Sequence, residues 1–330
     1  MNVSRTAPLG DTGLTLTALG LGAAPLGGLF AGVTLDDARA TVDQAWSNGL
    51  RYFDVAPLYG YGLAERRLGA LLAERPRDEY VLSTKVGRLV RPAPEREPGD
   101  MFTGAPPGTA TFDYSRDGVL RSVEQSLGRL GLDRVDILYI HDPDEHFAAA
   151  AGEAYPALDE LRRQKVVSAI GVGMNQSPML ARFVRETDVD VVLCAGRYTL
   201  LDQRALADLL PTCAERGVGV VIGGVYNSGL LADPSASAHY DYAPPTDDLV
   251  ARARRLASIC ARHGVPLKAA AIQFPYGHPA VTSVLTGARS AAELAENVAM
   301  FGRPIPAELW DELTAEGELA PGTPAPGGAG

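Results

Sequence analysis

Four polar residues of kinds that can bind and transfer a proton lie close to the ends of β-like segments. Asp54, Lys85 and His141 each lie at the end of such a segment, and Tyr59 follows Asp54 by five residues in a short Gly-rich loop. A single lysine at a strand end is usually a solvated rim residue, and a single histidine is usually a hydrogen-bonded core residue. Four such residues together are hard to explain structurally, because buried charges are costly unless they are paired.

These residue types form a coherent proton-transfer group when they meet. A phenol has an ordinary pKa of about 10, which is too high for ready proton exchange at neutral pH. We expect the ammonium of Lys85 to lower the pKa of Tyr59, Asp54 to keep Lys85 charged and oriented, and His141 to hydrogen-bond the substrate oxygen. Such a group acts as an acid when a carbonyl is reduced and as a base when an alcohol is oxidised. It supplies no electron pair, so the reaction needs a hydride carrier.

The segments that position these residues alternate along the chain between short β-like runs and longer amphipathic helical runs. The β-like runs are eight, at 17–22, 51–55, 80–86, 135–141, 166–173, 189–195, 218–224 and 280–286. The helical runs are at 35–48, 64–73, 115–130, 155–165, 178–186, 203–216, 247–263 and 291–301. Strands separated by helix-length segments indicate βαβ units and a parallel sheet. Eight such units predict an α/β protein of the (β/α)8 (TIM) barrel class.

In such a barrel, alternate residues of each strand point inward and the carboxyl ends of all strands meet at one rim. Asp54, Lys85 and His141 share the inward alternation and lie at this rim, where barrel enzymes keep their chemistry. Asp136 has the opposite alternation, so we expect it to be structural.

Three stretches fall outside the repeat. Residues 9–15 resemble a hairpin that could close the floor of the barrel. Residues 88–114 form a long Pro- and Gly-rich loop after the third strand, and loops of this length are uncommon unless they are functional or disordered. We expect this loop to close over the substrate. The composition from Ala320 onward predicts a disordered tail, which leaves residues 1–319 as one domain and 320–330 as the tail.

Composition excludes several classes of partner. The chain has 330 residues, of which 46% are apolar, and a formal net charge of −10. This charge argues against nucleic acid or an anionic membrane as the main partner. We find no leader and no apolar run of membrane-spanning length, and the three cysteines do not have metal-ligand spacing. We therefore expect no metal, a small-molecule substrate and a cytoplasmic location, with the oligomeric state open.

Four groups of motifs together resemble the aldo-keto reductase family over nearly the whole chain before the tail. They are Tyr-Phe-Asp-Val-Ala-Pro-Leu-Tyr-Gly at 52–60, Leu-Ser-Thr-Lys-Val at 82–86, the run 126–142, and Gly-Ala-Arg-Ser at 287–290 with Glu-Asn at 296–297. The resemblance implies that Tyr59 is the acid/base and that Asp54, Lys85 and His141 complete the family's tetrad. It also implies a nicotinamide cofactor bound without a Rossmann domain, and no Gly-x-Gly-x-x-Gly follows any predicted strand.

The resemblance places the extended cofactor over the barrel mouth. It implies that the pyrophosphate lies on Asn227, Ser228, Gly229 and Leu230. It implies that the adenosine lies among Gly287, Arg289, Ser290 and Asn297. The Ser and Asn that hold the carboxamide in many members are out of register here, and Asn175 is the expected substitute. The usual aromatic platform under the nicotinamide aligns near Gly223, with Tyr226 the nearest aromatic residue.

Two residues favour different cofactors. Arg289 could pair with the 2′-phosphate of NADP through its bidentate donors. Glu293 stands where NADP-specific members commonly carry an arginine, and its carboxylate would repel phosphate and accept a hydrogen bond from a free 2′-hydroxyl. Because a repulsive contact discriminates as strongly as a lost attractive one, we expect NAD to serve at least as well as NADP.

The motifs at 171–176 and 223–229 are similar to a branch that contains pyridoxal 4-dehydrogenase and aldose 1-dehydrogenases acting on L-fucose, D-threo-aldoses or L-galactose. This similarity implies oxidation of a cyclic hemiacetal at C1 to a lactone. Four alternatives stay open. They are a general NADPH-dependent aldehyde reductase, a pyridoxal 4-dehydrogenase-like enzyme, an aldolase-like enzyme with Lys85 as a Schiff base, and a non-catalytic cofactor-binding subunit.

Overall fold

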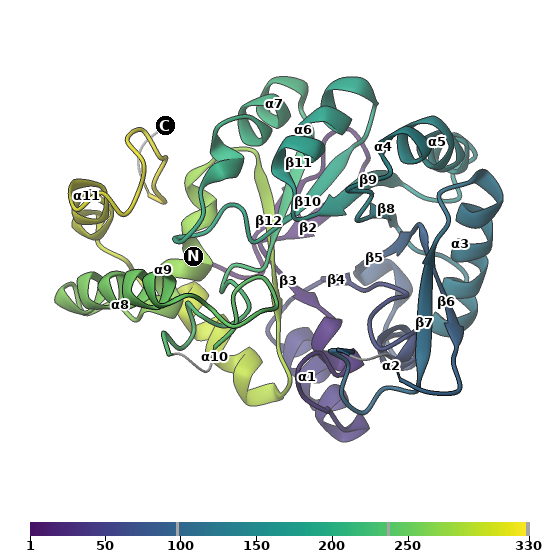
Figure 1. The fold of residues 1–330 in the computed structure, drawn as a ribbon, viewed down its shortest axis with the longest axis horizontal. Coiled ribbons are helices and arrows are strands. Elements are labelled where there is room, and N and C mark those ends of the chain that lie inside the picture. The colour runs from purple at the N-terminus through teal and green to yellow at the C-terminus, as the bar shows by residue number, and fades with distance from the viewer. Residues whose placement is uncertain (97–98, 236–237, 328–330) are drawn as a thin grey trace.

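Eight parallel strands close into a barrel in the computed structural model, which describes residues 1–96, 99–235 and 238–327 (Figure 1). Around the barrel they are β3 (Leu19–Gly22), β4 (Tyr52–Asp54), β5 (Val81–Val86), β8 (Ile137–His141), β9 (Ala169–Met174), β10 (Val191–Ala195), β11 (Gly219–Gly223) and β12 (Val281–Gly287). Strand β12 pairs in turn with β3 and closes the ring. Each strand falls in a predicted β-like run, so the predicted (β/α)8 barrel is confirmed.

The predicted helices surround the strands. They are α1 (Leu35–Ser47), α2 (Leu63–Leu72), α3 (Arg116–Leu130), α5 (Tyr155–Arg163), α6 (Ser177–Glu186), α7 (Leu209–Arg216), α8 (Asp247–Arg262) and α10 (Ala291–Gly302). Several begin where a hydroxyl side chain accepts a backbone N–H of the first turn, as Thr34, Ser115 and Ser290 do. The short helix α4 (Phe147–Ala149) continues through a π-helical turn at 150–154 into α5.

Besides the short α4, two described helices were not predicted from the sequence, α9 (Leu267–Gln273) and α11 (Ala307–Ala315). Most residues of α9 are buried, so its sequence lacks the polar stripe by which an amphipathic helix is recognised. Helix α11 carries such a stripe, with Leu309, Trp310 and Leu313 buried, but it follows the eighth βα unit.

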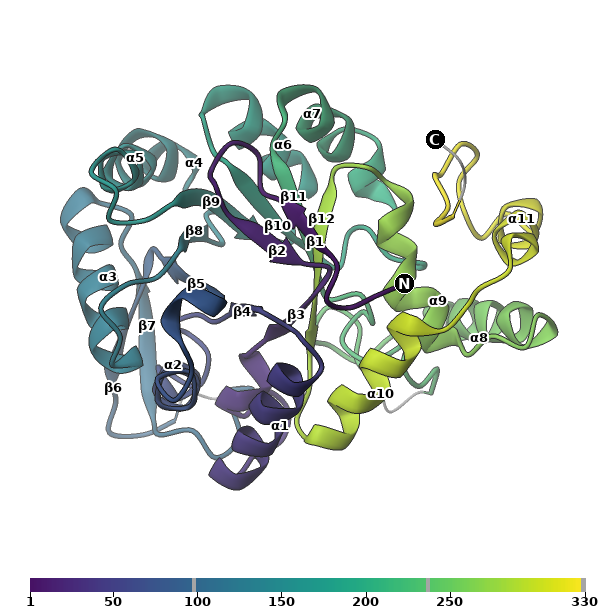
Figure 2. The same cartoon turned by 180° about the vertical axis from the view of Figure 1, so that it is seen from behind.

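An antiparallel hairpin of β1 (Thr6–Pro8) and β2 (Thr15–Thr17) crosses the amino end of the barrel, as the view from behind shows (Figure 2). Leu9 and Leu16 of this hairpin are fully buried in the cluster that fills the barrel interior. Leu9 lies so close to Gly219 that a Cβ there would be 2.4 Å from a Leu9 methyl group. The predicted hairpin at the barrel floor is confirmed, and it leaves the carboxyl end as the open one.

The predicted loop 88–114 contains an antiparallel ribbon of β6 (Arg88–Pro92) and β7 (Gly108–Phe112). Between these strands, backbone hydrogen bonds join the loop to the one after β3, from Phe30 to Met101 and from Thr103 to Gly28. The insertion after the third barrel strand therefore lies where it was predicted. Its two strands were not predicted from the sequence.

The described part of the tail lacks regular secondary structure. Residues 320–327 are described and contain no helix or strand, but the backbone of Pro324 lies directly against Gly277. Residues 328–330 lie outside the described residues.

All three cysteines are buried and free, as expected for structural thiols. Among the described helices, none combines the length and the apolar character that a membrane span requires.

Candidate active site

The ion pair between Lys85 and Asp54 lies inside the carboxyl end of the barrel. Lys85 Nζ donates to Asp54 Oδ1 (2.8 Å) and Oδ2 (2.6 Å) and to the carbonyl oxygen of Val55 (3.0 Å). The two side chains are only 2% and 4% exposed. All three donors of the ammonium are thereby engaged, which leaves no free lone pair for a Schiff base. The aldolase-like alternative does not fit this geometry.

A hydrogen-bonded layer beneath Asp54 holds this pair in place. Ser83 Oγ donates to Asp54 Oδ1 (2.7 Å), and the Tyr52 hydroxyl lies 3.2 Å from Ser83 Oγ and 3.1 Å from the Tyr139 hydroxyl. All these residues are buried and share the inward alternation of their strands. Tyr52, Ser83 and Tyr139 had no predicted role, although the inward alternation pointed to each of them. Asp136 points outward and accepts hydrogen bonds from Arg77 and from the Leu82 backbone, so its expected structural role is confirmed.

Tyr59 lies beside this pair with its ring centre 5.1 Å from Lys85 Nζ. Burial raises the pKa of the Tyr59 phenol well above its ordinary value, and the negative charges of Asp54 and Asp142 raise it further. The pKa is therefore not lowered overall as expected, because burial and the carboxylate charges outweigh Lys85, whose charge Asp54 balances at contact distance. In this state Tyr59 is a neutral phenol and a proton donor.

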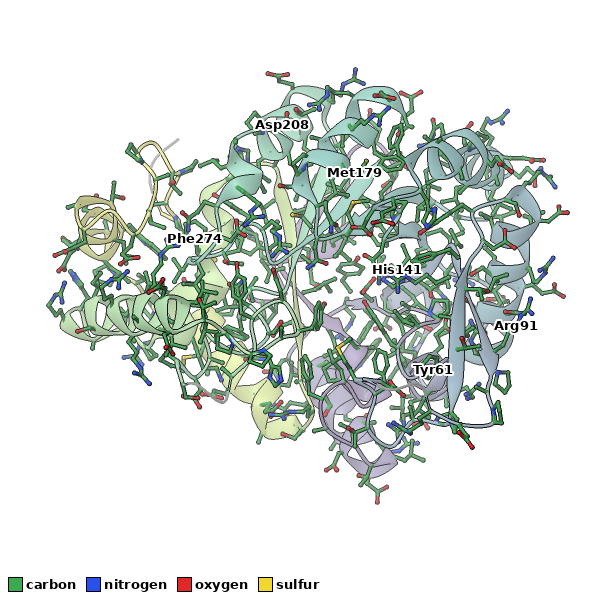
Figure 3. All side chains as sticks on the ribbon, in the orientation of Figure 1. Tyr61, Arg91, His141, Met179, Asp208 and Phe274 are labelled. Carbon is green, nitrogen blue, oxygen red and sulfur yellow. The ribbon has the colours of Figure 1, made fainter. Side chains whose placement is uncertain are left out.

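His141 completes the group at the end of β8, inside the ring of helices (Figure 3). Its ring stands edge-on to that of Tyr59, with the ring centres 6.1 Å apart. Burial lowers the pKa of His141 well below its ordinary value, and the positive charges of Lys85 and Arg88 add to this effect, so the imidazole is neutral.

Only one nitrogen of the His141 ring can serve as the donor. Nδ1 is buried and has no hydrogen-bond partner among the described residues, whereas Nε2 lies 3.4 Å from a carboxylate oxygen of Asp142. Unpaired buried N–H groups are rarer than unpaired acceptors. We therefore place the ring proton on Nε2, from which it can be donated to a substrate oxygen.

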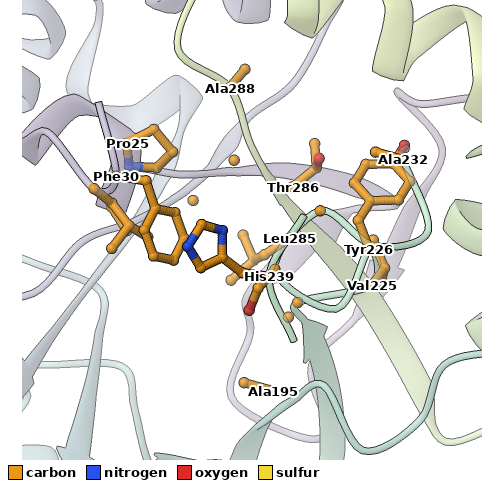
Figure 4. Close-up of a pocket in the computed structure, with 18 of the residues that line it drawn as sticks. Pro25, Phe30, Ala195, Val225, Tyr226, Ala232, His239, Leu285, Thr286 and Ala288 are labelled. Atoms are coloured by element: carbon orange, nitrogen blue, oxygen red, sulfur yellow. The ribbon is translucent and has the colours of Figure 1, made fainter. Parts of the chain in front are cut away.

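A cavity of about 630 Å³ at the barrel mouth is lined by Asp54 and Tyr59 and also by Arg289 and Glu293. Figure 4 shows part of its lining, including Pro25, Tyr226 and Leu285. Its lining includes five of the predicted cofactor residues, Ser228, Gly229, Gly287, Arg289 and Glu293. Gly229 adopts a left-handed φ of 109°, and a side chain there would be strained. The glycines let backbone and ligand approach closely.

The other predicted cofactor residues do not line this cavity. Leu230 is fully buried, and Asn175 follows β9 and is half-buried. Asn227 donates to the Gly196 carbonyl oxygen (3.3 Å), while its buried Oδ1 has no partner among the described residues. Asn297 is buried, donates to Thr286 Oγ1 (3.0 Å) and accepts from the Tyr226 hydroxyl (3.1 Å). Cofactor contacts for these residues stay predictions.

The two residues predicted to favour different cofactors bind each other. Ser290 caps α10 by accepting the N–H of Glu293, whose carboxylate in turn accepts the N–H of Arg289 (2.9 Å). This arrangement is a variant of the capping box, in which the carboxylate accepts the N–H of the residue before the N-cap and not that of Ser290 itself. The Arg289 guanidinium also donates to the Glu293 carboxylate through Nε (3.0 Å) and a terminal nitrogen (2.6 Å). The positive charge at this end of the cavity is therefore balanced.

Aromatic side chains from two loops meet at the mouth of the cavity. Phe30, from the loop after β3, stacks on His239, from the loop after β11, with ring centres 4.7 Å apart (Figure 4). The ring centre of Tyr242 lies 6.1 Å from that of Phe30, and Tyr242 also lines the cavity. Tyr226 lies on the far side of the cavity from Phe30, near Thr286 (Figure 4). The sequence analysis gave Phe30, His239 and Tyr242 no role.

The cavity fits an extended dinucleotide. Its volume is typical of ligand sites, and its lining is mostly apolar with a few polar groups. At one end the first turn of α10 presents backbone N–H groups and Arg289, which suit an anion. At the other end lie Asp54 and Tyr59, so a ring bound there would be next to the proton-transfer group.

Comparison with known proteins agrees with this geometry. Residues 18–317 match the Aldo/keto reductase family. The chain is 47% identical to D-threo-aldose 1-dehydrogenase from a Pseudomonas species, over 94% of this chain and 96% of that protein. It is 44% identical to pyridoxal 4-dehydrogenase from Microbacterium luteolum, over 97% and 99% of the two chains. The structure of an aldo-keto reductase from Bacillus halodurans in its holo form is similar with a TM-score of 0.72 and 25% identity, over 94% and 96% of the chains.

The resemblance inferred from the motifs is thus confirmed, and the non-catalytic alternative falls away. The chain is an oxidoreductase that belongs to the aldo-keto reductase family.

Proposed function

We propose that this enzyme oxidises a free aldose at C1 to its lactone, with Tyr59 as the acid/base and NAD or NADP as the hydride acceptor. The observation that carries the proposal is the buried Lys85–Asp54 pair beside Tyr59 and His141, at the end of a dinucleotide-sized cavity. The aldose substrate is supported by the 47% identity with a D-threo-aldose 1-dehydrogenase.

The residues divide the reaction between them. His141 Nε2–H donates to the anomeric oxygen and holds it beside Tyr59. The Tyr59 phenolate takes the proton of the C1 hydroxyl, while the hydrogen on C1 leaves with its electron pair and the C1–O bond becomes the carbonyl of the lactone. Lys85 supports the phenolate, and Asp54 fixes Lys85. A nicotinamide cofactor held in the cavity would supply the hydride acceptor and, in its oxidised form, a positive charge near Tyr59.

We further propose that NAD serves at least as well as NADP. Arg289 is the cation near the expected ribose, and it is already bound by the Glu293 carboxylate. To hold a 2′-phosphate, Arg289 would have to leave this carboxylate, which would itself repel the phosphate.

The test is a substrate panel with the purified protein. Free aldoses, including L-fucose and L-galactose, are assayed for NAD⁺ and NADP⁺ reduction at 340 nm, and simple aldehydes are assayed for NADPH oxidation. We expect aldose oxidation with a lactone as the product, which hydroxamate formation detects. Fast reduction of simple aldehydes without oxidation of any aldose would replace this proposal with a general aldehyde reductase.

Pyridoxal is the second candidate substrate. The supporting observations are the 44% identity with pyridoxal 4-dehydrogenase and the aromatic residues Phe30, His239 and Tyr242 around the cavity mouth, which suit a flat aromatic hemiacetal. Including pyridoxal in the panel decides between the two, because the preferred substrate has the higher kcat/KM.

A further inference from the structure

Asp142, which follows the tetrad residue His141 directly, is held in an uncommon backbone conformation. Its φ of 44° lies in the left-handed region, which residues other than glycine seldom adopt. The Asp142 N–H donates to the Gly173 carbonyl oxygen (3.0 Å), and the Tyr114 hydroxyl lies 2.8 Å from the His141 carbonyl oxygen and 2.9 Å from that of Asp142. Such conformations persist where the surroundings impose them, and they cluster at functional sites.

The two oxygens of the Asp142 carboxylate have different surroundings. Oδ2 accepts a hydrogen bond from Arg88 (2.7 Å) and lies 3.4 Å from His141 Nε2. No hydrogen bond from the described residues reaches Oδ1, and the side chain is 23% exposed. Arg88, at 22% exposed, rests over the ring of Phe112 at 4.8 Å. The pair thus keeps one acceptor open.

A purely structural ion pair in the same region looks different. Arg197 and Asp241 connect the loops after β10 and β11, and two guanidinium nitrogens meet both carboxylate oxygens at 2.8 Å each. That bidentate pair satisfies both oxygens. The Arg88–Asp142 pair uses one oxygen only, although it too connects two segments, β6 and the end of β8.

The charge of Asp142 acts on the space in front of the tetrad. It raises the pKa of both Tyr59 and Tyr242, which line the cavity, while Arg88 opposes it at each. Asp142 thus lies between Arg88 and His141, close enough to Tyr59 and Tyr242 for its charge to act on both phenols. An oxygen held by His141 Nε2 in this region lies within reach of a second hydrogen bond to the Asp142 carboxylate, and a hydroxyl on the adjacent carbon can span that gap.

We propose that Asp142, supported by Arg88, accepts a hydrogen bond from the hydroxyl group on the carbon next to the reacting carbon. The site thereby selects substrates with a hydroxyl at that position, namely aldoses and α-hydroxy aldehydes, over their deoxy counterparts. The assignment deepens the proposed function and rests on His141 and Tyr59 holding the reacting oxygen. A site that hydrogen-bonds a substrate hydroxyl discriminates against an analogue that lacks it, because its polar group is then left unpaired.

The experiment uses two pairs of substrates that differ in this one hydroxyl. The pairs are an accepted aldose and its 2-deoxy form, assayed for oxidation, and glyceraldehyde and propionaldehyde, assayed for reduction. Asp142→Gly removes the carboxylate and tolerates the left-handed φ. We expect kcat/KM for the hydroxylated member to fall roughly 10- to 100-fold, the scale of a hydrogen bond to a charged group, and that for the deoxy member to fall less than about threefold.

Asp144→Asn is the matched control, because it removes a nearby carboxylate that forms no hydrogen bond or ion pair with the tetrad in the described part of the chain. It should leave both ratios unchanged. Arg88→Lys keeps a cation beside Asp142 and gives a second variant if Asp142→Gly does not fold. It should also lower the ratio of kcat/KM for the hydroxylated substrate over that for its deoxy counterpart.

The outcomes separate this inference from the proposed function. If the wild type oxidises no aldose but prefers glyceraldehyde, and Asp142→Gly removes that preference, the inference stands and aldose oxidation fails. Equal losses on both members of each pair, in a wild type that does oxidise aldoses, would overturn the inference and leave Asp142 as a support for His141. A wild type without preference for the hydroxylated member of either pair would overturn it as well.

Discussion

Replacing Glu293 with glutamine should shift the cofactor preference toward NADP. Glu293 has two roles, since its carboxylate accepts the backbone N–H of Arg289 in the capping box and also binds the Arg289 guanidinium. A glutamine side chain can fill the same place in a capping box, so α10 should keep its N-terminal structure. The substitution removes only the negative charge, which frees Arg289 for a phosphate and abolishes repulsion of that phosphate.

The size of the effect follows from these contacts. The Arg289–Glu293 pair is exposed and spaced i, i+4, so breaking it in the wild type costs only about 0.3–0.5 kcal/mol. Release of Arg289 thus accounts for only about a twofold change. The larger part of the effect comes from the repulsion between the Glu293 carboxylate and a 2′-phosphate, which the glutamine removes, since a like-charge contact in a binding site costs up to several kcal/mol. We expect the ratio of kcat/KM for NADP⁺ over that for NAD⁺ to rise about 10- to 100-fold in Glu293→Gln, measured at a saturating concentration of the sugar.

Two further variants make this prediction decisive. Glu296→Gln lies on the same helix, pairs with Lys268 and does not line the cavity, so it should leave the ratio unchanged. Adding Arg289→Gln to Glu293→Gln should cancel most of the gain. A wild type that strongly prefers NADP⁺, or a Glu293→Gln variant with an unaltered ratio, would show that Glu293 does not face the ribose and that the reasoning is wrong.

Three other predictions concern the tetrad and its neighbour. Tyr59→Phe should lower kcat about 10²- to 10⁴-fold while the dissociation constant for the cofactor, followed by fluorescence quenching, stays near the wild-type value; a loss below tenfold would exclude Tyr59 as the acid/base. Lys85→Met should destabilise the fold by about 3–5 kcal/mol in urea unfolding, because it leaves the buried Asp54 unpaired, and should move the pH optimum of oxidation upward, since Asp54 then acts on Tyr59 without its counter-ion; an unchanged optimum would contradict this. Burial raises the pKa of Asp142 to about 6, above the value of an unfolded chain, so the native state binds this proton more tightly. The ionised Asp142 carboxylate therefore lowers the stability of the native state above pH 6, and this loss disappears as the carboxylate is protonated toward pH 4. The melting temperature of the wild type should rise relative to that of Asp142→Asn as the pH falls from 6 to 4.

The barrel and the tetrad could be predicted from the sequence because both depend on short-range regularities. Buried parallel strands are apolar runs of a few residues, and the inward alternation brings Asp54, Lys85 and His141 to one rim wherever the exact strand ends lie. The four residues were brought together as expected. The ribbon in the loop 88–114 was missed because its strands are short and rich in arginine, proline and threonine, and only pairing with each other defines them.

The remaining errors concern properties that depend on a third residue. Whether Lys85 lowers the pKa of Tyr59 depends on how closely Asp54 balances its charge, and sequence spacing does not give that distance. Arg289 and Glu293 were read as competing for the cofactor, whereas they bind each other across one helical turn. Asp142 was passed over because a polar residue just after a strand is typical of a turn, and its significance lies in the distance to Arg88 and His141.

The charged groups of the site form pairs, and this arrangement explains how one tyrosine can serve both directions of the reaction. Lys85 is balanced by Asp54, Arg88 by Asp142, and the imidazole of His141 is neutral. Burial and the negative charges of Asp54 and Asp142 raise the pKa of the Tyr59 phenol, which stays protonated and, in the proposed mechanism, donates to a carbonyl oxygen. A positive charge arriving in the cavity would meet no uncompensated cation and would favour the phenolate, which is the form that oxidation of an alcohol requires. In the proposed mechanism, the ligand beside Tyr59 therefore sets its protonation state, because the cations of the site are already paired with carboxylates.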